Sequence, residues 1–327
     1  MTSFATNPAL RRYWHVVARS SGVAADPVAV RLLGEDLVVW RAAGGGIGAL
    51  RDRCPHRESP LSAGKVKAGC VECPYHGWQF DQSGTCVLVP SSGVGAPVPP
   101  KAHVAPVHAT ERYGLVWLCL DEPVAGVPEI GQDGDAAFRR INFDVDVWHT
   151  AATRMVDNFL DITHFPYVHA ASFGSAAQPE VPHFELGDLD DWYGYRYSVT
   201  AANPNVAAAA SGQATATVQR FMSSGFALPF AVRSTIEYET GLEHILLLLS
   251  TPRDDETSSF TFVVWRNDDF SVPAEDVTRL DRMIEAEDKR MLERVRGTLP
   301  LDSTALVSVQ ADKASVEWRR QLRALLG

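Results

Sequence analysis

The stretch that decides how the first part of this chain folds is Cys54-Pro-His56, followed after 16 residues by Cys73-Pro-Tyr-His76. Each half pairs a cysteine with a histidine, and thiolate and imidazole are the side chains that hold soft metal ions. Two such pairs on two loops can close one metal site, which allows either zinc or an iron–sulfur cluster. Zinc sites normally space their paired ligands as C-x(2–4)-C. Cys70-Val-Glu-Cys73 fits that spacing, whereas Cys54-Pro-His56 is too short for it.

Short strand patterns surround these two pairs. Residues 37–50 predict a β-hairpin around a cluster of glycines, and residues 77–89 predict a second hairpin around a polar turn. The apolar run 113–120 predicts a strand that closes the region. These patterns indicate an all-β domain that carries both Cys/His pairs.

A change of composition marks the end of this region. Residues 122–135 are rich in Pro, Gly and Asp, which is typical of the segments that join domains. Beyond it the pattern includes long strands and helices. We therefore expect a first domain over residues 1–125 and a second over residues 126–327.

The second domain opens with an unusual polar stretch, Asn158-Phe-Leu-Asp161-Ile-Thr-His164-Phe-Pro-Tyr-Val-His169. Residues three apart share one face of a helix, so Asn158, Asp161 and His164 are predicted to form a polar stripe on a short helix. Pro166 is expected to end or kink that helix. Such a stripe is equally typical of a solvent-exposed face with a weak Asp161–His164 pair. A metal site therefore needs a further ligand.

A long helix predicted over residues 272–296 offers that ligand. At 100° per residue, Asp288 falls within a narrow apolar stripe, while Glu285 and Glu293 are predicted to point away from it. The stripe consists of Val277, Ile284, Met291 and Val295. A carboxylate on a face that packs against the core is costly unless it is paired or bound to a metal. Two histidines and one carboxylate form the facial triad of non-haem Fe(II) oxygenases.

Three strand patterns between the polar stretch and the long helix predict an antiparallel sheet. They cover residues 233–239, 244–250 and 259–265, joined by short polar turns. The alanine-rich residues 200–217 are open between a loop and a weak strand. A substrate pocket is expected between the sheet and the C-terminal helix. Its candidate lining residues, which are equally typical of an ordinary core, are Phe221, Phe226, Phe230 and Trp265.

Composition excludes some classes of protein. The chain has 327 residues and a formal net charge of −10, which argues against nucleic acid as a partner. No apolar run approaches the roughly 18 residues of a membrane span. Five cysteines are too few for a disulfide-built fold, and an odd number cannot all pair within one chain. With no clean signal peptide, we expect a cytoplasmic protein whose clustered cysteines bind metal.

The two Cys/His pairs resemble the Rieske [2Fe–2S] family, and the resemblance extends through Gly77-Trp-Gln-Phe80 and Gly84. It implies that Cys54 and Cys73 hold one iron and that His56 and His76 hold the other. Respiratory Rieske proteins carry an extra cysteine in each loop, where this chain has Ser59 and Tyr75. That difference favours the oxygenase or ferredoxin type. The three remaining cysteines are then expected to be ordinary buried residues: Cys70, Cys86 and Cys119.

The later residues resemble the mononuclear iron motif of the Rieske non-haem iron oxygenases. The resemblance implies that His164, His169 and Asp288 hold an Fe(II) ion. It implies catalytic roles for Asp161, as a bridging aspartate, and for Asn158. It also implies an α+β fold, in which an all-β Rieske domain precedes a helix-grip-like catalytic domain with an antiparallel sheet packed by helices.

The implied activity is that of an Fe(II)- and O₂-dependent oxygenase component. Because the chain has no nucleotide-binding fingerprint, electrons from NAD(P)H are expected to arrive through a separate reductase, with or without a ferredoxin. Its length resembles the single-subunit class that includes vanillate and dicamba demethylases, which favours monooxygenation, by hydroxylation or oxidative demethylation, of a small aromatic or cyclic substrate. The family also implies a head-to-tail homotrimer. In it, Asp161 joins its own His164 to His76 of a neighbouring subunit.

Three other interpretations remain open on the sequence. One is a ring cis-dihydroxylating dioxygenase. Another is a Rieske electron carrier whose second domain is a non-catalytic binding module, which would hold a cluster and consume no O₂. The third is a zinc-stabilised interaction protein, which would be colourless. Iron and sulfide contents distinguish the last two from an oxygenase.

Overall fold

The computed structural model describes residues 4–302 and 304–327, and the chain divides into two compact units. Unit 1 extends to Val127 and also includes Thr251–Asp254. Unit 2 comprises Pro128–Ser250 and Asp255–Gly327. The change of unit at Val127 lies inside the Pro-, Gly- and Asp-rich segment of the sequence.

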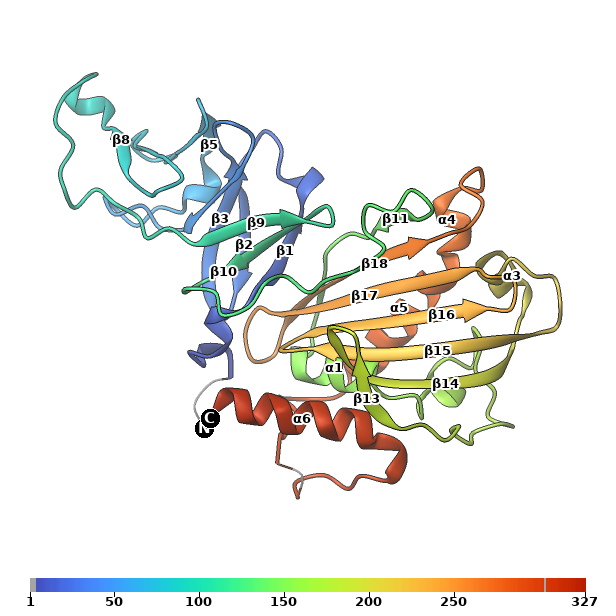
Figure 1. Ribbon diagram of the computed structural model, residues 1–327. Helices are drawn as coiled ribbons and strands as arrows, with labels where there is room; N and C mark the ends of the chain where they lie inside the picture. The colour runs from blue at the N-terminus through green and yellow to red at the C-terminus, as the bar shows by residue number, and fades with distance from the viewer. Residues whose placement is uncertain (1–3, 303) are drawn as a thin grey trace. The chain divides into compact units, whose positions relative to one another are not determined.

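Unit 1 is built from three small antiparallel sheets, ordered β1-β10-β9, β2-β3-β4 and β5-β6-β7-β8 (Figure 1). Its strands are β1 (His15–Arg19), β2 (Val28–Leu32), β3 (Glu35–Arg41), β4 (Ile47–Arg51), β5 (Lys65–Lys67), β6 (Cys70–Glu72), β7 (Gln79–Phe80), β8 (Cys86–Leu88), β9 (His108–Arg112) and β10 (Leu115–Cys119). Single 3₁₀ turns precede or join them: η1 (Phe4–Thr6) and η2 (Leu10–Arg12) before β1, and η3 (Ser20–Gly22), η4 (Leu61–Ala63) and η5 (Pro90–Ser92) between strands. Both predicted hairpins, β3–β4 and β7–β8, and the predicted closing strand, β10, are confirmed.

Close packing fixes the β3–β4 hairpin beside the first metal-ligand pair. Trp40 lies opposite Gly48, and a side chain at Gly48 would come within 2.4 Å of the indole ring. The same Trp40 belongs to a buried cluster that also contains Cys54, Cys73 and Phe80. The two cysteines that the sequence selects as ligands are therefore part of the apolar core of unit 1.

Unit 2 contains, in the described residues, an eight-stranded antiparallel sheet ordered β11-β18-β17-β16-β15-β14-β13, with β12 also paired to β18. Its strands are β11 (Arg139–Asn142), β12 (Asp146–Trp148), β13 (Leu186–Leu189), β14 (Trp192–Ala202), β15 (Thr217–Ala227), β16 (Ala231–Tyr238), β17 (Glu243–Pro252) and β18 (Ser258–Arg266). The last three confirm the predicted antiparallel strands. All three are longer than the sequence patterns indicated.

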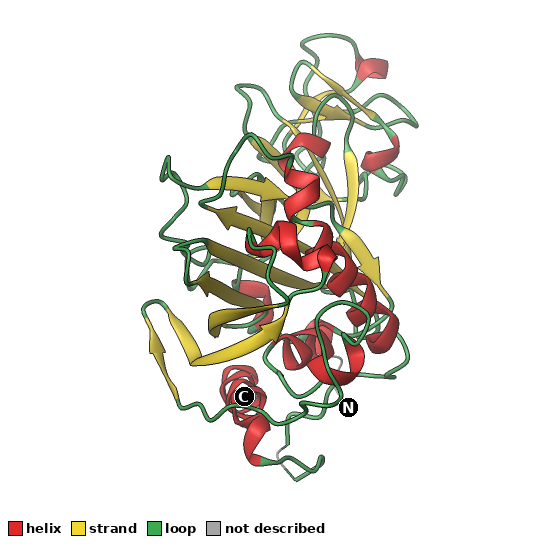
Figure 2. Ribbon diagram, turned by 90° about the vertical axis from the view of Figure 1, so that its right-hand side faces the viewer, coloured by secondary structure: helices red, strands yellow, loops and turns green. Residues whose placement is uncertain are grey.

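The helices of unit 2 gather mainly on one face of this sheet (Figure 2). They are α1 (Ala152–Phe159), α2 (Phe165–Val168), α3 (Asn205–Ser211), α4 (Ala274–Val277), α5 (Arg279–Leu292) and α6 (Lys313–Leu326), with one 3₁₀ turn, η6 (Gln310–Asp312). Met155 of α1 and Leu292 of α5 join Phe260 and Phe262 of β18 in one buried cluster. This cluster fixes α1 and α5 against the sheet. No helix in the described part of the chain combines the length and apolar character that a membrane span requires.

Two segments differ from the sequence predictions. The alanine-rich residues 200–217 were expected to be loop or weak strand, but α3 forms between Pro204 and Gly212 because alanine favours helix and a glycine in the left-handed region (φ +65°) ends it. The predicted long helix over residues 272–296 is instead α4 and α5, interrupted at Thr278 (φ −105°). The apolar stripe drawn through one continuous helix is therefore wrong at its C-terminal end, where Met291 is 44% exposed, whereas Val277 on α4 is buried.

Candidate metal centres

The first candidate centre is formed by two loops of unit 1 with the same backbone pattern. In residues 54–59, the Cys54 amide donates to Ser59 O (2.9 Å) and the Glu58 amide donates back to Cys54 O (2.9 Å). In residues 73–78, Cys73 donates to Trp78 O (2.8 Å) and Gly77 donates to Cys73 O (3.0 Å). The fifth residue of each loop has a positive φ, +60° at Glu58 and +70° at Gly77. The two loops thus present their cysteines in matching ways, while the histidine is the third residue of one loop and the fourth of the other.

Burial separates the thiols from the imidazoles. Cys54 and Cys73 are 1% and 2% exposed, whereas His56 and His76 are exposed. The two imidazole rings lie together, with centroids 4.4 Å apart, and Trp78 stacks on His56 at 4.6 Å. The residues thus form a buried thiol pair and a separate surface imidazole pair. This arrangement fits a two-iron cluster, in which each iron takes one kind of ligand.

The chemistry of the thiols also fits a bound cation. Burial raises the pKa of the Cys54 thiol to about 11, and the neighbouring Cys73 contributes to that rise. Two thiolates would therefore not persist side by side in this core without a positive charge between them. A coordinated metal supplies that charge and deprotonates the thiols it binds.

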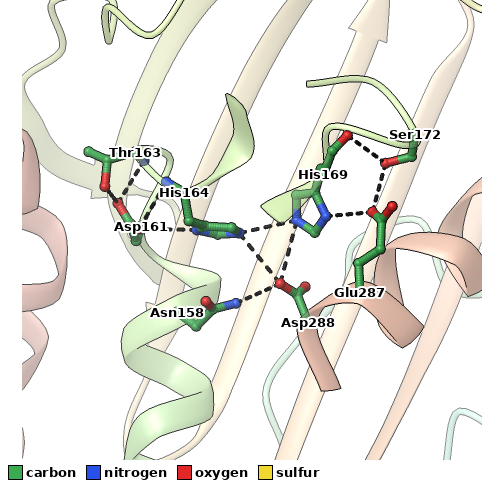
Figure 3. A network of polar contacts seen from close by, with 8 residues as sticks. All are labelled: Asn158, Asp161, Thr163, His164, His169, Ser172, Glu287 and Asp288. Carbon is green, nitrogen blue, oxygen red and sulfur yellow. Dashed lines mark hydrogen bonds and ion pairs between the residues drawn. The ribbon is translucent and has the colours of Figure 1, made fainter. Parts of the chain in front are cut away.

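The second candidate centre lies in unit 2 and takes its groups from α1, from the residues on either side of α2 and from α5 (Figure 3). Asn158 is near the end of α1, Asp161 and His164 lie in the turn before α2, and His169 follows α2. Asp288 comes from α5. The predicted single helical stripe is wrong, because α1 ends at Phe159 and a new helix starts at Phe165. The turn between them nevertheless brings the stripe's polar residues to one place.

Three ligand atoms converge at this place. His164 Nε2 and His169 Nε2 are 3.1 Å apart and lie 3.5 Å and 3.4 Å from Asp288 Oδ1. In the described part of the chain, this trio is the one group of three or more metal-binding side chains whose ligand atoms all lie within 4.8 Å of one another. His169 and Asp288 are buried, and His164 is nearly so. The structure thus brings together all three predicted iron ligands.

The protonation of both histidines follows from their second nitrogen. His164 Nδ1 lies 3.0 Å from Asp161 Oδ2, and His169 Nδ1 lies 2.8 Å from Glu287 Oε2. A carboxylate only accepts hydrogen bonds, so each Nδ1 carries the proton and each Nε2 presents a lone pair. Two lone pairs and a carboxylate oxygen then face one another with no proton between them. A cation at that point resolves the repulsion, so the donor set fits a metal ion.

Electrostatics at the second centre favour a neutral His169 beside two aspartates whose pKa values shift in opposite directions. Burial lowers the pKa of His169, although Asp288 and Glu287 oppose the change. Burial raises the pKa of Asp288, although both histidines and Asn158 favour its charged form. Burial alone would raise the pKa of Asp161, but hydrogen bonds from His164 and Thr163 bring it below its ordinary value. Of these two aspartates, Asp161 is therefore the one that stays charged more readily.

Supporting side chains hold the three ligands. The Asn158 amide donates to Asp288 Oδ1 (3.0 Å), so Asn158 positions a ligand. Glu287 accepts from His169 and from the Ser172 hydroxyl (2.8 Å), which also contacts the backbone of His169. The sequence showed Glu287 only as the neighbour of Asp288 and gave no sign of this contact. It gave no sign of Ser172 either.

A cavity of about 250 Å³ adjoins the second centre, and all its lining residues belong to unit 2. It lies between the sheet and the helix α5, as the sequence predicted. Its apolar wall from the strands consists of Met222, Ile236, Leu246, Leu248, Phe260 and Phe262. Glu285 also lines the cavity, contrary to the prediction that it points away. Burial, followed by the charge of Asp146, raises the pKa of Glu285 to about 7.

The four aromatic residues predicted to line the pocket do not line it. Phe221 alternates with Arg220 and Met222 on β15, so its side chain lies on the other face of the sheet, where it is 43% exposed. Phe226, Phe230 and Trp265 are buried elsewhere in the core. Strand alternation, which is visible in the sequence, excludes Phe221 only once the inward residue of β15 is known.

Comparison with known proteins reveals two matched families. The Rieske [2Fe-2S] domain matches residues 13–100, and the vanillate O-demethylase oxygenase C-terminal domain matches residues 148–327. Methylxanthine N1-demethylase NdmA of Pseudomonas putida is 31% identical over 97% of this chain and 89% of its own length. A solved structure of Pseudomonas putida CBB5 NdmA with caffeine superposes with a TM-score of 0.84, at 29% identity, over 98% of this chain and 92% of that one. The dicamba O-demethylase oxygenase component of Stenotrophomonas maltophilia is 33% identical over 50% of this chain and 48% of its own length.

Proposed function

Since this chain belongs to the Rieske non-haem iron oxygenases, an oxidoreductase family, we propose that it is a monooxygenase that hydroxylates or oxidatively demethylates a small aromatic or cyclic molecule. The observation that carries the proposal is the convergence of His164, His169 and Asp288 beside an apolar cavity. The names of the relatives support demethylation, since they include N- and O-demethylases.

We assign the metal groups to the residues that fit them. Cys54, His56, Cys73 and His76 would hold the [2Fe–2S] cluster, and His164, His169 and Asp288 would hold Fe(II). When bound, these groups activate O₂ beside the substrate and supply the electrons that O₂ activation needs. The electrons come from NAD(P)H through a partner reductase, with or without a ferredoxin. We also propose that the protein works in the cytoplasm, where NAD(P)H and such a reductase would be available to it.

The protein side chains prepare this chemistry by orientation and by exclusion of water. Asp161 and Glu287 each hold one histidine with its Nε2 lone pair toward Asp288. Asn158 holds the Asp288 carboxylate by donating to Oδ1. The apolar strand side chains keep water away from the reacting atoms, which strengthens each electrostatic interaction there. A carboxylate behind each ligating imidazole also raises its basicity.

We further propose that the protein works as a head-to-tail homotrimer, in which electrons pass between subunits. His76 is exposed, and the Asp161 side chain is 22% exposed, so both remain accessible to a second copy. In the trimer, the imidazole of His76 donates to Asp161, whose other contacts are with His164 and Thr163. Asp161 then joins the cluster ligand of one subunit to the iron ligand of the next.

The test compares Asp161→Asn with wild type and with Thr163→Val, which removes one hydrogen bond and keeps the carboxylate. Each protein is supplied with a surrogate reductase, NADH and a panel of methoxy- and N-methyl-aromatic compounds. O₂ uptake and product mass are measured together with iron, sulfide and the visible spectrum. We expect Asp161→Asn to keep the cluster and, at saturating Fe(II), the mononuclear iron, and to lose turnover by roughly 10–100-fold. Thr163→Val should retain most turnover.

Each alternative has its own outcome. Unchanged turnover in Asp161→Asn would remove the bridging role. Two irons per chain and no substrate-dependent O₂ uptake in wild type would identify an electron carrier instead. A product that gains both atoms of O₂ on one ring would identify a cis-dihydroxylating dioxygenase.

A further inference from the structure

One charged side chain in the cavity is not used by the metal centre. Arg220, on β15, is 4% exposed and lines the cavity. Its guanidinium group makes no hydrogen bond or ion pair with any residue that the structure describes. Its Nε and Nη2 atoms, which form one edge of the guanidinium group, are buried without a partner. A buried guanidinium in this state is costly unless something else supplies the missing acceptor.

The other buried arginines show that this fold normally satisfies such groups. Arg266 donates to Asp268 (2.7 Å) and to His244 (2.8 Å), and it also bonds a carbonyl group of α3. Arg319 donates to Asp157 (2.8 Å). Both therefore have a carboxylate within hydrogen-bond distance. Among the buried arginines of the described residues, Arg220 is the exception.

Aromatic rings hold the guanidinium group beside the metal centre. Its central carbon lies 5.6 Å from the centroid of the Phe173 ring and 5.9 Å from that of Tyr238. Phe173 in turn stacks on His169, with centroids 5.2 Å apart. A single ring therefore separates the guanidinium group from a predicted iron ligand. A molecule of one or two rings can reach both.

The acids that line the cavity do not neutralise this charge. Asp288 faces the two histidines and Asn158, and Asp281 lies 3.3 Å from His244 Nε2. Neither these nor the other lining acids, Glu180 and Glu285, lie within ion-pair distance of Arg220 in the described structure. The remaining wall near β15 is largely apolar. The missing acceptor must then come from a molecule that enters the cavity.

We propose that Arg220 binds an oxyanion, a carboxylate or a sulfonate, on the substrate, so that the substrates are small aromatic or cyclic acids. The planar guanidinium group carries paired N–H groups, which match the two oxygens of such an anion. The anion would lie at one end of the substrate and the oxidised carbon at the other, toward His164 and His169. This assignment rests on the proposed function only in taking the cavity as the substrate site.

The experiment measures binding without turnover. Calorimetric titrations of the whole protein, with no electron donor, compare 4-methoxybenzoate with 4-methoxybenzamide and toluene-4-sulfonate with toluene-4-sulfonamide. The variants are Arg220→Met, Arg220→Lys and, as a matched control, Arg233→Met. Arg233 lies on the neighbouring strand and packs over Trp192, and it does not line the cavity.

We expect wild type to bind each acid more tightly than its amide. Arg220→Met should weaken the binding of the acids by roughly 10–100-fold and change the binding of the amides little. Arg220→Lys should bind the acids with an affinity between those of wild type and Arg220→Met. Arg233→Met should bind them as wild type does. Arg220→Met should also melt no lower than wild type in the absence of ligand, since it removes an unpaired buried charge. Acids that bind no more tightly than amides, a preference that survives in Arg220→Met, or a large drop in its Tm would each overturn the proposal.

This result is separable from the proposed function. If acids bind through Arg220 but the loaded enzyme with reductase and O₂ forms no product, the oxygenase assignment fails while the anion site stands. If product forms equally from amides, in wild type and in Arg220→Met, the anion site fails while the oxygenase assignment stands.

Discussion

At the residue scale, Asp288 and Glu287 are neighbours with opposite tasks. Asp288 faces the two Nε2 atoms, whereas Glu287 turns to His169 Nδ1 and the Ser172 hydroxyl. Both carboxylates are buried. Adjacent helical residues point about 100° apart, so one can contact the centre directly while the other supports it from behind.

Glu287→Gln tests this support. The glutamine amide keeps the shape of the Glu287 side chain but removes the negative charge that accepts the hydrogen bond from His169 Nδ1. We expect the affinity of the mononuclear site for Fe(II) to fall by roughly 10–100-fold. Iron titration of the cluster-loaded protein measures it. Ser172→Ala, which removes one neutral contact, should have a smaller effect. Equal iron affinity in Glu287→Gln and wild type would contradict the supporting role.

A second residue-scale prediction concerns pH and His15 of β1. Its Nε2–H donates to Leu10 O (2.9 Å), and burial lowers the pKa of His15 from 6.5 to about 4. As the pH falls, His15 takes up a proton in the unfolded chain at a higher pH than in the folded protein. The contribution of His15 to the free energy of unfolding is therefore complete above pH 6.5. It is lost as the pH falls toward 4, by about 3 kcal/mol in all.

Urea titrations followed by cluster absorbance, which reports on unit 1, measure this loss. Between pH 7 and pH 5, the free energy of unfolding of wild type should fall by about 2 kcal/mol more than that of His15→Gln. The glutamine side chain can still donate a hydrogen bond but does not titrate. All other groups are common to both proteins. The same pH dependence in the two would show that His15 is not buried in its neutral form.

The sequence could identify residues whose chemistry is unusual for their position. The two Cys/His pairs were visible as a pattern, and Asp288 was visible as a charge on an apolar stripe, even though that stripe was drawn through a helix that is in fact broken. Arg220 was not visible, because it lies in a polar strand segment and its lack of a partner is a property of three dimensions. Glu287 was hidden for a similar reason, since it has no distinctive spacing apart from Asp288.

At the element scale, the turn at Gly84 shows how tightly the sheet beside the cluster loops is built. Gly84 has a φ of +80°, and a Cβ there would lie 1.8 Å from Val104 O. Its carbonyl accepts a hydrogen bond from the Val104 amide (2.9 Å). The turn and the chain that passes over it therefore leave no room for a side chain.

Gly84→Ala and Gly95→Ala separate backbone strain from this steric clash. Gly95 has the same φ of +80°, but a Cβ there would meet nothing within 4 Å. Gly95→Ala should lower the free energy of unfolding by about 1 kcal/mol, from backbone strain alone. Gly84→Ala should cost several kcal/mol, because backbone atoms must also move. Thermal unfolding and cluster absorbance measure both. Equal losses would mean that the turn at Gly84 relaxes freely.

Elements with a strong local signal were predicted well, and those decided by tertiary contacts were not. The β3–β4 hairpin follows from a glycine cluster between apolar runs, and β16–β18 follow from their alternating and apolar patterns. The break at Thr278 has no proline or glycine to announce it. The end of α1 at Phe159, before the predicted stripe was complete, is similarly unmarked in the sequence. Yet these two breaks set which side chains face the cavity.

At the scale of the whole molecule, the two metal centres belong to different compact units. The residues proposed to hold the cluster lie in unit 1, and those proposed to hold Fe(II) lie in unit 2. The order of the two motifs in the chain indicated this arrangement. The head-to-tail assembly could only be inferred by resemblance, because one chain holds no record of its neighbours.

This separation predicts that either centre can be removed alone. Wild type should contain about three irons and about two sulfides per chain. His164→Ala should lose about one iron and keep the sulfide and the visible spectrum. Cys73→Ser should lose the sulfide and the colour and keep about one iron. Joint loss of both centres in either variant would mean that the units do not load independently.

The division of labour in unit 2 also has a consequence for how such proteins diversify. Helix α5 and the residues that flank α2 carry the proposed metal ligands, while β14 to β18 form much of the wall that meets the incoming molecule. A substitution on a strand can alter which molecule is admitted without disturbing the ligands of the iron. Selection, natural or in the laboratory, can therefore explore new substrates in small steps while the oxidising machinery is inherited intact.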